Sequence, residues 1–260
     1  MTNIIRADIY RIIRGKSLYI ISLLVVLFGL MVVIAATLTD ATLPFVNASP
    51  EALELNGINS AGLLFSNGPM LTFLLIPLVM MVAGPIFTDG TAKNEIAWGI
   101  SRTRLYTARL IIVTVVCGLM LLVYLTAGMI FATILRGFGD YIPYGYWFNI
   151  IKTIVLQSFM FSAASWMGIF LIFTIKSGYA FVEVFMGVMV APTLIAVLFM
   201  NANIDLSRVL DFDITTNIGR LGAVADMDTR GILMALVVGA VWMVIPTIIG
   251  LIRFQKAEIK

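Results

Sequence analysis

The chain has 260 residues, of which 61% are hydrophobic and 12% are charged, whereas a soluble domain carries about 25% charged residues. This composition excludes a soluble globular domain, because one core cannot bury so much apolar surface. The absence of histidine excludes histidine-based metal sites and catalytic triads, so no metal site is predicted, and the single cysteine, Cys117, excludes an intramolecular disulfide.

Residues 2–15 show a helical period of their own. At 100° per residue the apolar and polar side chains separate onto two faces. One face holds Ile5, Ile9, Ile12 and Ile13, and the other holds Asn3, Arg6, Tyr10 and Arg14. The pattern predicts a short helix lying on the inner leaflet, with a frayed basic tail as the alternative.

Six apolar runs are long enough to cross about 30 Å of hydrocarbon, which takes roughly 20 helical residues. They lie at 18–38, 70–87, 110–135, 150–175, 179–200 and 231–252. We find no internal repeat and no soluble insertion. The sequence therefore predicts one all-α transmembrane domain over 1–260, in a multi-pass protein of the cell (cytoplasmic) membrane.

The basic residues predict the orientation of these spans. Five of the 17 Lys and Arg residues fall on one side: Arg136, Lys152, Arg208, Arg220 and Arg230. The other 12 fall on the side of the N-terminus, and residues 39–69 contain none. Since cytoplasmic loops collect Lys and Arg, both termini are predicted to be cytoplasmic. The outer connections 39–69 and 201–230 are long enough to hold short helices.

The connection between the second and third spans predicts a short transverse helix over 91–98. Gly90 ends the incoming span, and Thr91 suits the N-cap position of a new helix. Gly99 suits a helix C-terminus, and Ser101 can cap the helix that leads into the third span.

Polar residues inside the spans are few. Glu183 is the only acidic residue well inside a predicted span, where a charge is costly and should face protein or water. Ser158, Ser162 and Ser165 lie at helical spacing in the fourth span, with Gln157 nearby. Glu183, Gln157, Ser158 and Ser162 are candidates for a translocation path. The alternatives are that the small residues only allow close helix packing and that Glu183 reaches the headgroups or Lys176.

No nucleotide-binding motif occurs in the chain, neither a P-loop nor a dinucleotide fingerprint. No nucleophile–base pair is visible either, so the chain is not predicted to be an enzyme. The excess of Lys and Arg reports membrane orientation, and no nucleic acid is expected as a partner.

The connection carries an acidic residue, a Gly-Thr-x-Lys-Asn run, a Gly-x-Ser-Arg run and a later basic residue. The positions are Asp89, Gly90, Thr91, Lys93, Asn94, Glu95, Gly99, Ser101, Arg102, Tyr106 and Arg109. In this stretch the sequence resembles the permease subunits of bacterial ABC-2-type ABC transporters, although Arg109 stands where Lys is commoner.

The resemblance implies that helix 91–98, which ends at Trp98, is a coupling helix seated on a separate ATP-binding subunit. That subunit would hold ATP and Mg²⁺, so this chain needs no cofactor of its own. Lys93, Glu95 and Arg102 are then expected to be exposed charges of the docking surface. The resemblance further implies an elbow helix at 2–15 and pairing with a second permease, identical or different.

The function expected from this resemblance is export of an amphiphilic substrate, such as an antimicrobial peptide, driven by ATP hydrolysis in the partner subunit. The cargo and the direction of transport stay open. Two alternatives stay open as well: an ion-coupled carrier or channel, and a membrane scaffold or sensor that transports nothing.

Overall fold

The computed structural model describes residues 2–42, 56–88, 90–142, 144–201, 207–223 and 229–256, and every regular element in these ranges is a helix. Six stretches within them are long and apolar enough to cross a membrane: Lys16–Leu38, Gly68–Phe87, Arg102–Arg136, Tyr146–Ile175, Gly178–Phe199 and Thr229–Lys256. The prediction of an all-α membrane protein with six spans is confirmed.

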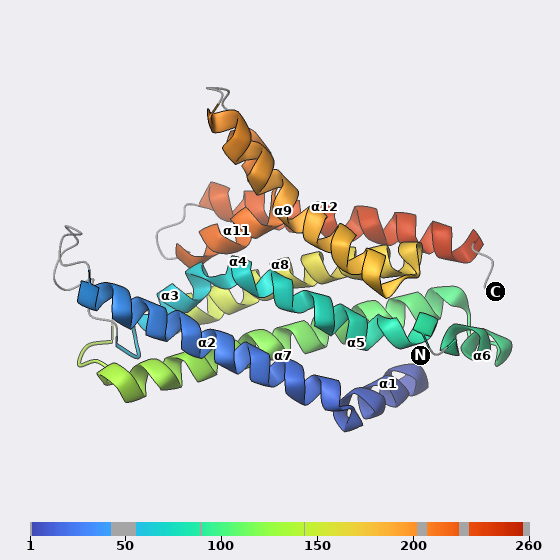
Figure 1. The fold of residues 1–260 in the computed structure, drawn as a ribbon, viewed down its shortest axis with the longest axis horizontal. Helices are drawn as coiled ribbons and strands as arrows, with labels where there is room; N and C mark the ends of the chain where they lie inside the picture. The colour runs from blue at the N-terminus through green and yellow to red at the C-terminus, as the bar shows by residue number, and fades with distance from the viewer. Residues whose placement is uncertain are drawn as a thin grey trace.

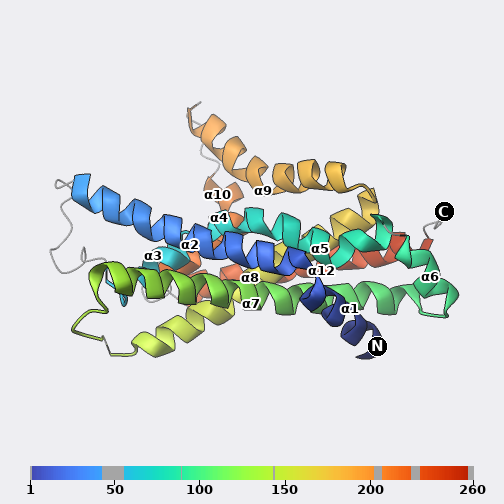
Figure 2. The same cartoon turned by 60° about the horizontal axis from the view of Figure 1, so that its bottom comes forward.

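The long helices form a bundle with one diverging member. In chain order the elements are α1 (Thr2–Arg14), α2 (Lys16–Thr42), α3 (Ser60–Ser66), α4 (Gly68–Leu71), η2 (Thr72–Leu74), α5 (Leu75–Thr88), α6 (Thr91–Ala97), α7 (Arg102–Arg136), α8 (Tyr146–Ile175), α9 (Gly178–Asn201), α10 (Ser207–Asp211), α11 (Ile214–Arg220), η3 (Leu221–Ala223) and α12 (Thr229–Lys256). Helices α2, α5, α7, α8 and α12 run along the long axis, and α9 slants away from them (Figures 1 and 2). The start of α1, helix α6 and the end of α12 lie at one end, which we call the α6 end.

Helix α8 lies at the centre of the bundle and is the most buried of the six spans. Its middle carries a run of small buried residues, Ser162, Ala163, Ala164 and Ser165, followed by Gly168. A Cβ added at Gly168 would lie 2.9 Å from a methyl group of Val79 in α5. Small side chains therefore allow α5 to approach α8 closely, as is usual where helices pack in lipid.

The span predicted at 70–87 is confirmed as Gly68–Phe87, although it is not one continuous α-helix. A 3₁₀ segment, η2, separates α4 from α5. Pro77 lacks an N–H and its ring excludes the carbonyl of Phe73, four residues earlier, from a regular α-helical bond. The tighter 3₁₀ turn accommodates this break in the ladder.

Short helices occur in both long connections, 39–69 and 201–230, as expected from their length. Helix α3 falls within 39–69, and α10, α11 and η3 fall within 201–230. Helix α3 is bonded to the bundle, because the buried hydroxyl of Tyr124 donates to the carbonyl of Leu64 at 3.1 Å.

Helix α1 forms where the amphipathic pattern predicted it. Its apolar face is divided, since Ile12 is buried against the bundle while Ile9 and Ile13 are exposed. Asp8 is also buried, although it is charged. The helix therefore packs on the protein as well as presenting apolar side chains outward.

Candidate coupling site at the α6 end

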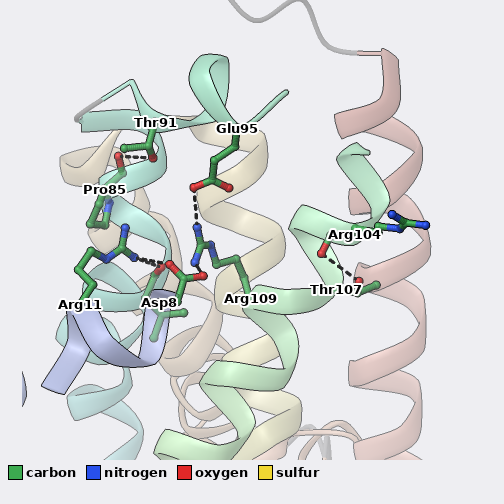
Figure 3. Close-up of polar contacts among 9 residues, drawn as sticks. Asp8, Arg11, Pro85, Thr91, Glu95, Arg104, Thr107 and Arg109 are labelled. Atoms are coloured by element: carbon green, nitrogen blue, oxygen red, sulfur yellow. Dashed lines mark hydrogen bonds and ion pairs between the residues drawn. The ribbon is translucent and has the colours of Figure 1, made fainter. Parts of the chain in front are cut away.

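Helix α6 begins after a left-handed backbone conformation that glycine, which has no side chain, adopts easily. Gly90 has φ 63 and ψ 18 and occupies the N-cap position, without a side-chain hydrogen bond. Thr91 is thus the first residue of α6, and the prediction of Thr91 as the N-cap is wrong. Its hydroxyl donates instead to the carbonyl of Pro85 in α5 at 3.2 Å (Figure 3). This bond ties the first turn of α6 to the end of the preceding span.

Helix α6 ends in a Schellman motif. The N–H of Gly99 donates to the carbonyl of Ile96 at 2.9 Å, and the N–H of Ile100 donates to the carbonyl of Glu95 at 3.2 Å. Gly99 has φ 82, so the glycine predicted for the C-terminus is confirmed. Two residues later Ser101 caps α7 by accepting from the N–H of Arg104 at 3.4 Å, also as predicted.

The inner face of α6 is held by a buried charge cluster. The guanidinium of Arg109 in α7 donates to Oε1 of Glu95 at 3.3 Å and forms an ion pair with Oδ2 of Asp8 in α1 (Figure 3). The side chain of Arg109 is 0% exposed, that of Asp8 is 7% exposed and that of Glu95 is 24% exposed. Arg109 therefore joins α1, α6 and α7 at one point.

Arg11 completes this cluster. It lies 3.3 Å from Oδ1 of Asp8, and its Nη2 donates to the carbonyl of Val82 in α5 at 3.4 Å. Two arginines and two carboxylates therefore balance each other in the cluster. Burial raises the pKa of Glu95 above its ordinary value, and the positive charge of Arg11 partly offsets that rise.

The outer face of α6 carries the exposed members of the motif. Lys93 and Asn94 are exposed, and the Trp98 side chain is 87% exposed at the end of the helix. A tryptophan so open to solvent buries little of its large apolar surface within this chain. The geometry thus separates a bonded inner face from an open outer face.

Two of the three charges expected on the docking surface face inward, which corrects that prediction. Glu95 turns toward Arg109 because a buried cation needs a partner. Arg102 donates from Nη1 to the carbonyls of Phe254 at 2.9 Å and Gln255 at 2.8 Å. It therefore caps the last turn of α12, where cations are favourable. Of the three, only Lys93 is exposed as expected.

Tyr106, the remaining member of the motif, is buried in an aromatic group with Phe173 and Phe254. A Cβ added at Gly250 would clash with its hydroxyl, so α7 and α12 meet closely here. Asp89, the predicted acidic position, lies outside the described residues.

Three of the residues proposed for a translocation path lie on one stretch of α8, and the fourth, Glu183, lies on α9. Gln157 is buried, and its Nε2 donates to the carbonyls of Phe65 at 2.9 Å and Ile218 at 3.0 Å, which ties α8 to α3 and α11. The hydroxyl of Ser162 donates to the carbonyl of Ser158 within α8. Glu183 lies on the exposed side of α9.

Sequence reasoning missed Asp8 and Arg11. Asp8 is the single acidic residue of an otherwise basic amphipathic helix, and its position on that helix gave no sign of a distant partner. The available signal was the combination of that acid with Arg109, a cation that directly precedes a long apolar run.

The fold and this site define a six-span, all-α membrane protein with a short helix anchored across one end of the bundle. A family model described as "Protein of unknown function (DUF2705)" matches residues 19–260, and the chain belongs to that family. No curated protein matches the chain.

Proposed function

We propose that this chain is the membrane-spanning permease subunit of an ATP-driven ABC exporter. A separate subunit would bind ATP and Mg²⁺ and dock on the outer face of α6. The observation that carries the proposal is the contrast between the two faces of α6. The inner face is bonded to α5 and α7, and through Arg109 it is linked to α1, whereas the outer face presents Trp98 to solvent.

The exposed Trp98 supports docking of a protein partner at this surface. Binding energy in protein interfaces is concentrated in a few side chains, and tryptophan is the residue most enriched among them. Lys93 and Asn94 beside it would supply a polar rim.

The connections of α6 support a mechanical role. A force applied to α6 reaches α5 through the Thr91–Pro85 bond and reaches α7 and α1 through the ion pairs of Arg109. A rigid element linked to several spans is what converts closure of an ATPase into movement of a membrane domain.

Two features of the sequence support the proposed orientation and the proposed class of cargo. The excess of Lys and Arg at the α6 end supports a cytoplasmic position for α6 and both termini, in the cell membrane. The resemblance of 89–109 to ABC-2 permeases supports pairing with a second permease and an amphiphilic cargo such as an antimicrobial peptide.

Affinity purification in mild detergent tests the proposal. The tagged chain should retain a stoichiometric subunit with a P-loop ATPase motif. Removal of an interface hot spot costs about 2 kcal/mol or more, so Trp98→Ala should weaken this association roughly thirtyfold. Trp147→Ala is the matched control, because Trp147 is also exposed and lies at the start of α8.

Two results would reject the proposal. One is a chain that purifies without any ATPase, which would favour a carrier, channel or scaffold. The other is an ATPase that binds Trp98→Ala and wild type equally, which would place the docking surface away from α6.

A further inference from the structure

A groove between α2 and α5 opens at the α6 end of the bundle, beside α1. Its volume is 490 Å³, within the roughly 300–1,000 Å³ of sites for small molecules. Its mouth is polar, with Arg11, Gly15 and Ser17 among the lining residues, and its floor is apolar, with Ile20 and Leu24 from α2.

The groove runs from the level of α1 into the apolar depth of the bundle. On α2 its lining extends from Ser17 to Leu24, a rise of about 10 Å, and on α5 from Pro85 back to Pro77, about 12 Å. The two helices run in opposite directions, so both measures start at the α6 end. The floor therefore reaches about a third of the way across a 30 Å hydrocarbon layer.

The mouth of the groove is surrounded by positive charge. Arg11 is held there by Asp8 and by the carbonyl of Val82, and 36% of its side chain is still exposed. Arg6, Arg14 and Lys16 are exposed on α1 and at the start of α2. The one acid of α1, Asp8, is shared between Arg11 and Arg109, so it offsets only part of the positive charge on α1.

We propose that this groove binds one glycerophospholipid of the adjoining leaflet, with an anionic headgroup at Arg11, Gly15 and Ser17 and an acyl chain along α2 and α5. The combination of a cationic mouth and an apolar trough matches a molecule with a phosphate at one end and a hydrocarbon chain at the other. This site does not depend on the transport proposal.

A helix from a second copy of the chain would fill the apolar trough but leave the cationic mouth at Arg11 without an anion. A soluble phosphate would use only the mouth and leave the apolar trough empty.

Native mass spectrometry of the delipidated full chain in detergent, titrated with phosphatidylglycerol or phosphatidylcholine, tests the site. Arg11→Gln removes the positive charge at the mouth of the groove. Gly84→Leu places a side chain in the trough, and it can do so without a clash because the nearest atom to an added Cβ is the flexible end of Met80, at 3.7 Å. Arg14→Gln is the matched control, because Arg14 is exposed on the same helix and does not line the groove.

We expect one phosphatidylglycerol per chain, bound about fivefold more tightly than phosphatidylcholine, which is the effect of about one basic contact. Arg11→Gln should remove that preference, Gly84→Leu should lose both lipids, and Arg14→Gln should change neither by more than about twofold. A monodisperse elution peak checks that each variant is folded. If Arg11→Gln does not fold, the lipid binding of Gly84→Leu alone tests the proposed site.

Equal lipid binding by wild type and Gly84→Leu would overturn the proposal. So would an equal loss in Arg14→Gln, because it would indicate diffuse attraction to the basic surface. A dimer that Gly84→Leu dissociates without changing the lipid count would show a second copy in the groove instead.

Discussion

Replacing Arg109 by methionine tests whether the charge cluster holds α1, α6 and α7 together. The change removes the charge and keeps a long apolar side chain, but it leaves Asp8 buried with Arg11 as its remaining partner at 3.3 Å. Breaking a buried ion pair costs about 3–5 kcal/mol. Glu95 is partly exposed and can be solvated, and Asp8 keeps Arg11, so we expect the lower end, about 3 kcal/mol.

Thermal unfolding in detergent, followed by the loss of the monodisperse elution peak, measures this effect. A loss of about 3 kcal/mol should lower Tm by roughly 6–12 °C. Arg104→Met is the matched control, because Arg104 is exposed on the same helix and points away from the cluster in Figure 3, and it should change Tm by less than about 2 °C.

A double-mutant cycle isolates the Asp8–Arg109 pair. If the two charges interact, Asp8→Asn combined with Arg109→Met should recover at least about 1 kcal/mol relative to the sum of the single changes. Strictly additive losses, or an Arg109→Met protein as stable as the Arg104→Met control, would refute the reasoning.

Three further predictions concern stability in the same assay. Because burial raises the pKa of Glu95, the contribution of its carboxyl group to stability is fully present below its ordinary pKa of 4.5 and is lost as pH rises through the folded-state pKa. The Tm of wild type minus that of Glu95→Gln should therefore decrease from pH 4.5 to 7, and a constant difference would contradict this prediction. Gly99→Ala should cost about 1 kcal/mol from backbone strain alone, since φ is 82 and no atom lies within 4 Å of the added Cβ, whereas Gly118→Ala in the middle of α7, also in open space, should stabilise. Gln157→Leu should cost about 2–3 kcal/mol, because two buried carbonyls lose their donor; a normal Tm with altered transport would instead place Gln157 in a substrate path.

The spans and the short helices could be predicted because their signals are local. An apolar run of sufficient length specifies a membrane helix without reference to any other segment. The bounds of α6 were predictable for a similar reason, since Gly90 and Gly99 adopt positive φ values that other residues avoid. The irregularity in the second span also has a local signal, because the 3₁₀ segment η2 lies just before Pro77.

The direction in which polar side chains face could not be predicted, because it depends on which helices pack together. Glu95 and Arg102 are polar residues in a short loop, and nothing local distinguishes them from Lys93. Their partners, Arg109 and the end of α12, become neighbours only when the bundle forms. The same holds for Asp8, whose partner lies far away in the sequence.

The chain order of the charge cluster has a consequence for biosynthesis. A membrane protein is synthesised from its N-terminus, so the ribosome makes Asp8 and Glu95 before Arg109. Arg109 lies seven residues into α7, about 10 Å along that helix, where an unpaired cation would hinder insertion. Asp8 and Glu95 have therefore been synthesised before the third span leaves the ribosome, so the guanidinium of Arg109 can enter the membrane together with its counterions.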